Sequence, residues 1–226
     1  METLETLVWA VDGLIDTACL DKKDIINMLN RQQLLIAGGG ERMYGMPPLP
    51  PLPGLEDTFQ VRAFPGRNHA NLPVQYHRGD GDLVWLKDTG EQIDVIDQIK
   101  SFYKKNSKVI GGTGKINACC FSGGRLHYVN SPAAKTDLVF PGYRYPEPMV
   151  TDQDVPNGIP DHLQYPLLVN GSVYVYYNFL DQDQGKALHN IGKHQMFFQQ
   201  ALTDLQLWIQ SQDGAWNMEA DASIFQ

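Results

Sequence analysis

A glycine-rich run at residues 111–115 (Gly-Gly-Thr-Gly-Lys) comes nearest in this chain to nucleotide chemistry. A phosphate-binding loop cradles phosphates with backbone N–H groups, and it needs a glycine where Val109 stands and a Ser or Thr where Ile116 stands. Without that hydroxyl the run has no side-chain ligand for Mg²⁺. We therefore interpret residues 111–115 as a loop without a catalytic role.

An acidic run at residues 181–185 (Asp-Gln-Asp-Gln-Gly) is similar to the start of a calcium-binding loop. In such a loop the glycine stands at the sixth position and a Glu closes the site at the twelfth. Here the glycine comes one position early, and no Glu follows at the required distance. The run is more typical of a turn between two helices.

The histidines do not combine into a metal site or a catalytic site. His189 and His194 are five residues apart, whereas two metal ligands on one helix face stand four apart. His127 and His162 have no partner that the sequence identifies. The chain also lacks a Gly-x-Ser-x-Gly motif and a local signature around a nucleophilic cysteine. We therefore predict no enzyme activity, no cofactor and no metal.

Three cysteines, Cys19, Cys119 and Cys120, form neither a disulfide framework nor a zinc-binding spacing. Reduced thiols in an intracellular setting are expected. Neighbouring residues of a strand point to opposite faces of its sheet, so we expect at most one of Cys119 and Cys120 in a core.

The net charge of −8 and the pI of about 5.1 argue against a general nucleic-acid binder, whose affinity rests on Lys and Arg. One basic cluster stands out, Lys104, Lys105 and Lys108 with Lys115 nearby, and we interpret it as a solvated loop. No apolar run approaches the roughly 20 residues that span a bilayer, so no membrane partner is expected.

Apolar residues recur at helical spacing in four stretches. Residues 4–20 and 22–37 are expected to form two N-terminal helices, with Asp21 as the cap of the second and the glycines at 38–40 as its end. A helical hairpin follows near the C-terminus. Its first helix begins at Pro160, which suits a first helical turn, and Asp161, which places negative charge there. Its second helix covers about 186–209.

Short strands separated by Gly, Pro and Asn are expected between these helices. This spacing is typical of an antiparallel sheet or small sandwich. Residues 94–103 have apolar positions at steps of three, so a short helix is the alternative there. The glycines at 123–124 indicate a hairpin turn. The predicted strands are 58–64, 72–77, 83–86, 93–96, 116–121, 125–129 and 138–140.

Changes in composition divide the chain into five segments. We predict N-terminal helices of a bundle at 1–40, a Pro-rich connector at 41–57, an inserted β region at 58–145, a loop and C-terminal helical hairpin at 146–210, and an extended C-terminal arm at 211–226. The predicted fold class is α+β. It consists of an antiparallel bundle of about four helices, an inserted antiparallel β-sheet or small sandwich, and an extended C-terminal tail.

The prolines of residues 47–53 fix many φ angles and remove backbone donors, so this segment is expected to be extended or PPII. We interpret it as a stiff connector that leaves the helical layer. An SH3-type ligand is the alternative.

The layout of the chain resembles the head-to-tail adaptor (connector) proteins of tailed bacteriophages. In that family a strand ending in a Tyr-x-Pro phrase leads through a loop containing an apolar-Pro pair into two long antiparallel helices. The matching residues here run from Tyr143 to Pro146 and then include Ile159 and Pro160. A family hairpin that precedes the strand often carries two prolines, and residues 126–132 carry only one of them.

The resemblance implies a structural virion protein that forms an oligomeric ring, twelve-fold in that family. The ring would join the portal to the tail and line the DNA exit channel. Its implied partners are the portal protein, tail, nozzle or neck proteins and further copies of the chain, with DNA only passing through. Its implied location is the virion neck, and the host cytoplasm during assembly. Two alternatives stay open: another tail-completion or baseplate structural protein, and a host-directed binding module that uses the Pro-rich segment.

The C-terminal arm keeps large apolar residues among acidic ones, namely Trp216, Met218, Ile224 and Phe225. A solvated tail is normally poor in aromatics, and large apolar side chains anchor a peptide in a partner's pocket. Adaptors of this family commonly send a C-terminal arm into the portal ring, so these four residues are candidate portal-binding residues. The alternative is that Trp216 and Phe225 fold back on the chain's own helices.

Overall fold

The computed structural model describes residues 1–15, 20–38, 49–79, 83–107, 111–179 and 184–222 of the chain. The chain forms two compact units. The first, the helical unit, combines Met1–Leu55 with Tyr145–Gln226, and the second, the β unit, is Glu56–Arg144. The β unit is therefore inserted between two halves of the helical unit.

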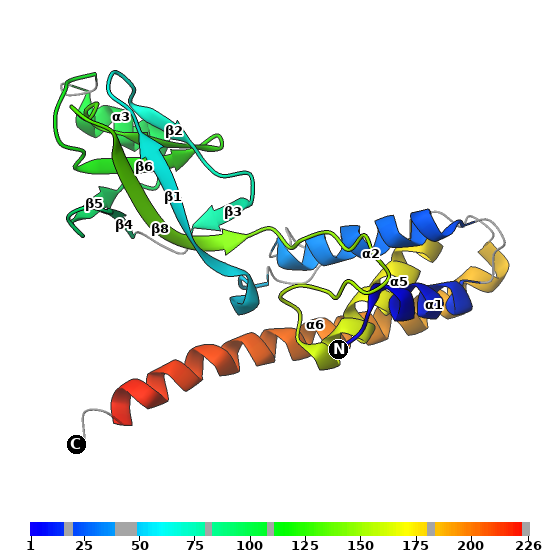
Figure 1. Ribbon diagram of the computed structural model, residues 1–226. Helices are drawn as coiled ribbons and strands as arrows, with labels where there is room; N and C mark the ends of the chain where they lie inside the picture. The colour runs from blue at the N-terminus through cyan, green and yellow to red at the C-terminus, as the bar shows by residue number, and fades with distance from the viewer. Residues whose placement is uncertain (16–19, 39–48, 80–82, 108–110, 180–183, 223–226) are drawn as a thin grey trace. The chain divides into compact units, whose positions relative to one another are not determined.

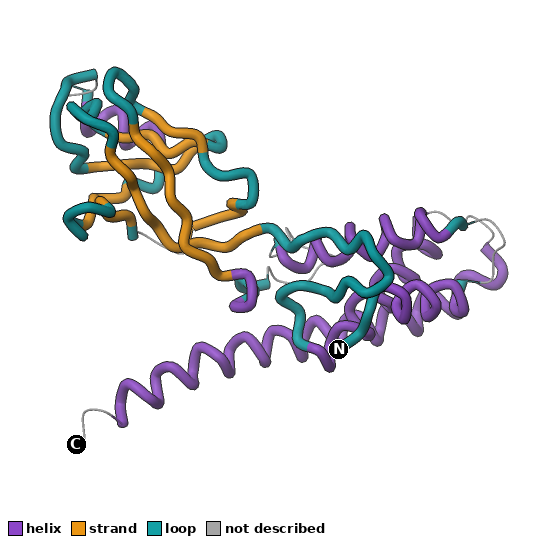
Figure 2. The backbone as a smooth tube through the Cα atoms, viewed as in Figure 1, coloured by secondary structure: helices purple, strands orange, loops and turns teal. Residues whose placement is uncertain are grey.

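The helical unit contains most of the helices of the molecule (Figures 1 and 2). Its elements are α1 (Leu4–Leu14), α2 (Lys22–Ala37), the 3₁₀ turn η2 (Pro53–Leu55), α4 (Asp161–Gln164), η3 (Tyr165–Val169), α5 (Asn170–Phe179) and α6 (Gln184–Ala222). Their apolar faces enclose one core, which also includes three leucines of the Pro-rich region and its continuation, Leu49, Leu52 and Leu55.

The two N-terminal helices begin at side-chain caps. Thr3 and Thr6 form a reciprocal capping box at the start of α1. The backbone N–H of Asp24 donates to the Asp21 carboxylate at 2.8 Å, which caps α2. Gly38 follows the end of α2. The predicted cap at Asp21 is confirmed.

Proline explains the irregular turn between α4 and α5. Residues Tyr165–Val169 form a π turn, and Pro166 stands at its beginning. Because proline has no N–H, an ordinary α-helical ladder cannot form through this position, and a wider turn accommodates the ring. Leu167 and Leu168 on this turn are fully buried.

Helices α5 and α6 run side by side in opposite directions (Figure 1). The buried face of α6 follows helical spacing through Phe198, Leu202, Leu205 and Ile209. His194 lies on the same face, and its Nδ1–H donates to Asn170 Oδ1 of α5 at 2.8 Å. Within the described ranges, we find no helix with enough length and hydropathy for a transmembrane span.

The β unit holds an eight-stranded sheet and one helix. Its elements are β1 (Glu56–Ala63), β2 (His69–Asn71), β3 (Tyr76–Gly79), β4 (Val84–Leu86), β5 (Gln92–Val95), α3 (Ile99–Asn106), β6 (Ala118–Ser122), β7 (Arg125–Tyr128) and β8 (Thr136–Arg144). The order of hydrogen-bonded strands is β1-β8-β4-β5-β6-β7-β2, and β3 also pairs with β8.

One strand pair in this sheet is parallel. Strands β5 and β6 run in the same direction, and α3 lies between them in the chain. A parallel pair needs such a crossover, whereas the other pairs are antiparallel. The end strands β1 and β2 approach each other, so the sheet curves into a nearly closed barrel.

Helix α3 explains why Cys119 and Cys120 are both fully buried. Cys119 faces the interior of the barrel, and Cys120 packs with Phe102 of α3 on the opposite face. The expectation that at most one of them lies in a core is therefore wrong, because both faces of β6 are covered. Burial raises the pKa of the Cys119 thiol to about 12, which keeps it protonated and unreactive.

The predicted fold class is wrong about the size and type of the β-sheet. The structure is mixed α/β with a large barrel-like sheet, not a helical bundle with a small inserted antiparallel sheet. Strand β8 is much longer than the predicted 138–140 because it continues through Pro141 and Gly142. Proline is tolerated there because β4 pairs with β8 only up to Val139, and β3 pairs with it from Gly142 onward.

The predicted extended C-terminal tail is also wrong, because α6 continues as a helix through residues 211–222. Apolar periodicity fades after Ile209, but this segment contains Ala215, Met218, Glu219 and Ala220, which have high helix propensity. Propensity and continuity with the preceding turns therefore extend the helix beyond its periodic part.

Two glycine-to-alanine changes should have opposite effects on stability. At Gly142 an added Cβ would lie 2.7 Å from the backbone oxygen of Arg78, so Gly142→Ala should lower the free energy of unfolding by about 2 kcal/mol. Gly13 lies in α1 with no atom within 4 Å of an added Cβ, so Gly13→Ala should raise stability by about 0.5 kcal/mol.

Urea denaturation followed by circular dichroism measures both changes. Equal stability of the Gly142→Ala variant and the parent would contradict the tight approach of β3 to β8.

Candidate functional site

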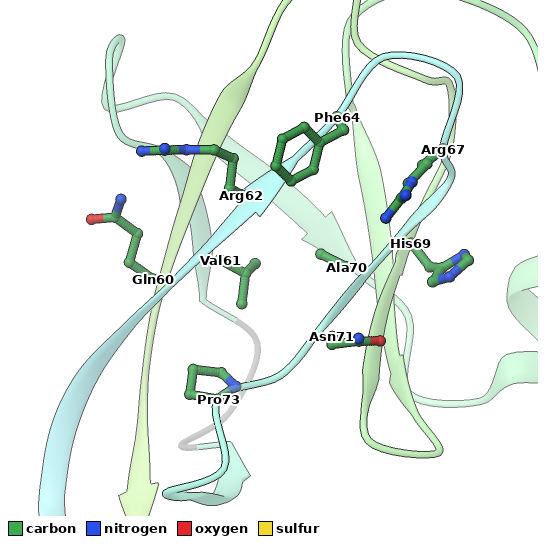
Figure 3. Close-up of a pocket in the computed structure, with 9 residues that line it drawn as sticks. All are labelled: Gln60, Val61, Arg62, Phe64, Arg67, His69, Ala70, Asn71 and Pro73. Atoms are coloured by element: carbon green, nitrogen blue, oxygen red, sulfur yellow. The ribbon is translucent and has the colours of Figure 1, made fainter.

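A depression of about 350 Å³ lies in the β unit beside strands β1 and β2 (Figure 3). In the described part of the chain, β1 pairs only with β8 and β2 only with β7, so each has one open edge. Open strand edges offer backbone donors and acceptors to another molecule. The residues that line the depression are Gln60, Val61, Arg62, Phe64, Arg67, His69, Ala70, Asn71 and Pro73.

The turn between β1 and β2 fixes the upper end of this depression. Gly66 has a φ of +77°, which suits glycine, and its N–H donates to Ser131 Oγ at 2.5 Å. The N–H of Arg67 donates to the carbonyl of Phe64 at 3.2 Å. The N–H of Tyr128 in β7 donates to the Asn68 carbonyl at 2.9 Å. These bonds hold Phe64 and Arg67 on one tight turn.

One arginine of the depression is already neutralised. The guanidinium of Arg62 donates to both carboxylate oxygens of Asp137 on β8, at 2.7 and 3.0 Å. Hydrogen bonding from Arg62 is the main reason that the pKa of Asp137 lies below its usual value. A paired arginine of this kind orders the sheet surface and contributes little positive field of its own.

Two other cations stand over one aromatic ring. The guanidinium of Arg67 and the ammonium of Lys135 each lie 5.9 Å from the centroid of the Phe64 ring, which is 38% exposed. Within the described ranges neither cation forms an ion pair. We call Phe64, Arg67 and Lys135 the cationic seam. Figure 3 shows Phe64 and Arg67 at the same end of the depression.

A pair of histidines lies next to the seam. His69 of β2 stands opposite His127 of β7, with ring centroids 6.1 Å apart. The Tyr103 hydroxyl lies 3.3 Å from His127 Nδ1. Burial is the main cause that lowers the pKa of His127. Sequence analysis found no partner for His127, and the structure supplies two.

The residues of the depression and of the cationic seam can contribute to the recognition of another molecule. The depression and the cationic seam together supply open strand edges, the exposed Phe64 ring and the cations Arg67 and Lys135, which fit an acidic protein surface. A search of the described residues for three or more His, Cys, Asp or Glu side chains placed to hold a metal ion finds none.

Helix α6 provides a second surface. On its outward side, Met196 is 59% exposed, Phe197 is 43% exposed and Leu207 is 59% exposed. Met196 and Leu207 are eleven residues apart, close to three helical turns, so they lie on one stripe of the helix. A helix with a buried apolar face and further apolar residues outside has a surface that a partner can cover.

The four candidate portal-binding residues lie at or beyond the end of α6. Trp216 and Met218 belong to the helix, in a part whose side chains lie outside the description. Ile224 and Phe225 lie outside the described residues altogether. The role proposed for these residues stays a prediction.

The residues that carry the family resemblance lie on the route from the sheet to the helices. Tyr143 is on β8, with the Arg78 guanidinium 5.8 Å above its ring, and Pro146 is buried. Ile159 is 4% exposed in the core of the helical unit. Pro160 stands directly before α4 as its N-cap residue. These positions are structural within their units.

Side chains of α2 hold the loop that these residues frame. Asn30 donates to the carbonyl of Met149 and accepts from its N–H, both at 2.8 Å. Gln33 Nε2 donates to the Glu147 carbonyl at 2.9 Å. The loop before α4 is therefore fastened to the N-terminal helices.

The motifs set aside at the sequence level have structural roles where they are described. Lys115, the last residue of the glycine-rich run, forms an ion pair with Glu91. His194 is buried against Asn170. The acidic run 181–185 lies mostly outside the described residues, as do Cys19 and Lys108.

Sequence analysis missed the cationic seam. Its members are far apart in the chain, and no short motif joins Phe64 and Arg67 to Lys135. The charge distribution could have indicated a basic surface, because Glu56–Arg144 holds 12 of the 18 Lys and Arg residues. Net charge over the whole chain hides this local excess.

Comparison with known proteins does not place this chain in a family. The chain matches no protein-family model, and no curated protein matches it either. A function for it therefore has to come from its own residues.

We expect the free energy of unfolding to fall as the pH drops below about 6.5. Burial is the main cause that lowers the pKa of both His127 and His194 in the folded chain. The unfolded chain therefore binds protons first on acidification, and that binding draws the equilibrium toward unfolding. His194→Gln should reduce this pH dependence in urea denaturation between pH 8 and about 5.5.

A slope in the His194→Gln variant equal to that of the parent would contradict burial of the neutral ring.

Proposed function

We propose that this chain is a structural adaptor of the head-to-tail junction of a tailed bacteriophage. The observation that carries the proposal is the length of α6 relative to its partner. Helix α6 has 39 residues and is therefore about 58 Å long, whereas the antiparallel run Asp161–Phe179 is about half that length. Its C-terminal part continues past the helices of its own unit (Figure 1).

The part of α6 that extends beyond the helices of its own unit can contact another molecule. Among the described side chains of α6, Ile209 is the last buried one, Ser211 and Gln212 are exposed, and the helix continues to Ala222. A peptide helix in a groove is a common mode of protein recognition, with large apolar residues as anchors. Trp216 and Met218 in this segment are the residues that we propose for the portal contact.

The outward residues of the described part of α6 support an assembly role. Met196, Phe197 and Leu207 are each more than two-fifths exposed. Burying an apolar side chain of this size contributes roughly 1.5 to 3 kcal/mol. A few such contacts per subunit, repeated around a ring, give strong overall binding from weak pairwise contacts. Subunits would then associate only weakly with one another until a portal gathers them into a ring.

The overall charge fits a channel through which DNA passes. With a net charge of −8, the chain offers few cations to retain phosphates. In the proposed ring, twelve-fold by resemblance, copies of the chain join the portal to tail or neck proteins at the virion neck, after assembly in the host cytoplasm. The DNA moves through the ring without being held.

Of the two alternatives, the host-directed module is disfavoured by burial of the Pro-rich region. Leu49 is 8% exposed and Leu52 is 1% exposed, and both pack in the core of the helical unit. A partner that gripped these leucines would have to remove them from that core. Another tail-completion or baseplate component would use the same surfaces of α6, and a particle image separates it from a neck adaptor.

Removal of residues 213–226 should leave the thermal transition nearly unchanged and abolish binding to the portal. The transition should persist because the buried side chains that the structure describes on α6, from His194 to Ile209, all precede this segment. Differential scanning calorimetry measures stability, and light scattering of mixtures with purified portal measures ring binding. A large fall in Tm would instead support folding of this segment onto the chain's own helices.

A double substitution tests whether portal binding depends on the two apolar side chains or only on the length of the helix. Trp216→Ala with Met218→Ala keeps a good helix former at both positions and should weaken portal binding at least about tenfold. The exposed Gln212 supplies the control on the same helix, and Gln212→Ala should bind like the parent. If the double variant binds the portal as tightly as the parent, Trp216 and Met218 are not the anchors of this contact.

A further inference from the structure

The formal charges of the chain divide unevenly between its two units. The β unit carries 12 Lys and Arg against 9 Asp and Glu, a charge of +3. The helical unit carries 6 Lys and Arg against 17 Asp and Glu, a charge of −11. A molecule with one acidic and one basic unit attracts further copies of itself in a head-to-tail sense.

In the basic β unit, the cationic seam is a defined surface that carries exposed positive charge. Arg67 and Lys135 are exposed, and both stand at 5.9 Å from the Phe64 ring. No Asp or Glu lines the adjacent depression. Asp137 of β8 is already bound to Arg62. The seam therefore has positive charge that its own surroundings do not neutralise.

The acidic side has a matching surface on α1. Trp9 is 71% exposed, and Glu5 and Asp12 stand one helical turn before and after it. These three residues, with Val8 and Lys22, line a hollow of about 330 Å³. In the part of the chain that the structure describes, Glu5 and Asp12 form no ion pair, while Lys22 is bound to Asp152. We call Glu5, Trp9 and Asp12 the acidic α1 face.

We propose that the cationic seam of one copy docks against the acidic α1 face of a second copy. Each surface has an exposed aromatic ring beside two charges without an ion-pair partner, and the signs are opposite. In the contact Arg67 and Lys135 would meet Glu5 and Asp12, and Trp9 would be covered beside Phe64. This inference rests on the proposed ring and names the surface by which its subunits touch.

The chemistry favours a contact between protein copies over binding of nucleic acid. The seam has two unpaired cations, which is few for a phosphate-tracking groove. Exposed ion pairs contribute little by themselves, so the contact also needs the two aromatic rings to be removed from water. Because the two surfaces differ, the contact is heterologous, and such contacts build rings when their rotation closes.

Complementary charge reversals test this contact in the full-length chain. Variant A carries Arg67→Glu and Lys135→Glu, and variant B carries Glu5→Lys and Asp12→Lys. Sedimentation equilibrium at low salt should show self-association of the parent that weakens as salt rises. The self-association constants of variant A alone and of variant B alone should each be at least about tenfold lower than that of the parent.

Mixing A with B should restore association, because each seam then meets an α1 face of opposite charge. A contact inside one chain would not be restored by mixing, so failure of the mixture to associate overturns the proposal. A parent that stays monomeric up to about 1 mM at low salt overturns it as well. Trp9→Ala, at an exposed position, should also weaken association.

A matched control has the same change in charge elsewhere on the β unit. Lys100 and Lys104 are exposed on α3, and Lys100→Glu with Lys104→Glu should associate like the parent. If this control variant self-associates as weakly as variant A, the loss of association follows from overall charge, and the assignment of the contact to the cationic seam is overturned. Circular dichroism confirms that each variant is folded.

The self-association experiments can fail or succeed independently of the portal-binding experiments that test the adaptor proposal. If variants A and B self-associate like the parent while Trp216→Ala with Met218→Ala loses portal binding, the surface assignment fails and the adaptor proposal stands. If charge reversal acts as expected and no variant or parent binds portal, the self-contact stands and the adaptor proposal fails.

Discussion

The pairing of β1 with β8 is the constraint on which the inserted unit depends. Eight consecutive Cα partners join the two strands, from Glu56 with Tyr143 to Ala63 with Thr136. The first and last strands of the insert are thus neighbours, and the chain enters and leaves the β unit at adjacent positions. Since the ends meet, a unit of this size can be inserted into a helical unit without separating the two halves of that unit's chain.

Local signals in the sequence located the helices of the first unit, although they missed the continuation of α6 beyond residue 210. Asp21 caps α2, and apolar spacing gives the buried faces of α1 and α6. The sheet needed information that spacing does not carry. Strand β8 passes through Pro141 only because β4 and β3 pair with different parts of it. The parallel pairing of β5 and β6 depends on α3, which was only an alternative at the sequence level.

The candidate surfaces show the same division between local and long-range information. Trp216 and Met218 were found because large apolar residues in an acidic tail are conspicuous in one stretch of sequence. The cationic seam was missed because Lys135 joins Phe64 and Arg67 only after β1 and β8 have paired. The burial of both Cys119 and Cys120 was missed for a similar reason, since the burial of Cys120 depends on α3 lying over β6. Contacts of this kind follow from topology rather than from periodicity.

The gap in the barrel also limits how copies of the chain can join. Bare edges of sheets invite strand-to-strand stacking, which grows without end into fibres. Here β2 has only three residues, and Pro73, two positions after it, lines the gap. Proline cannot donate a hydrogen bond to a strand ladder, and Arg67 would repel the same arginine of a second copy. Both features disfavour continued growth by backbone pairing of strands between copies.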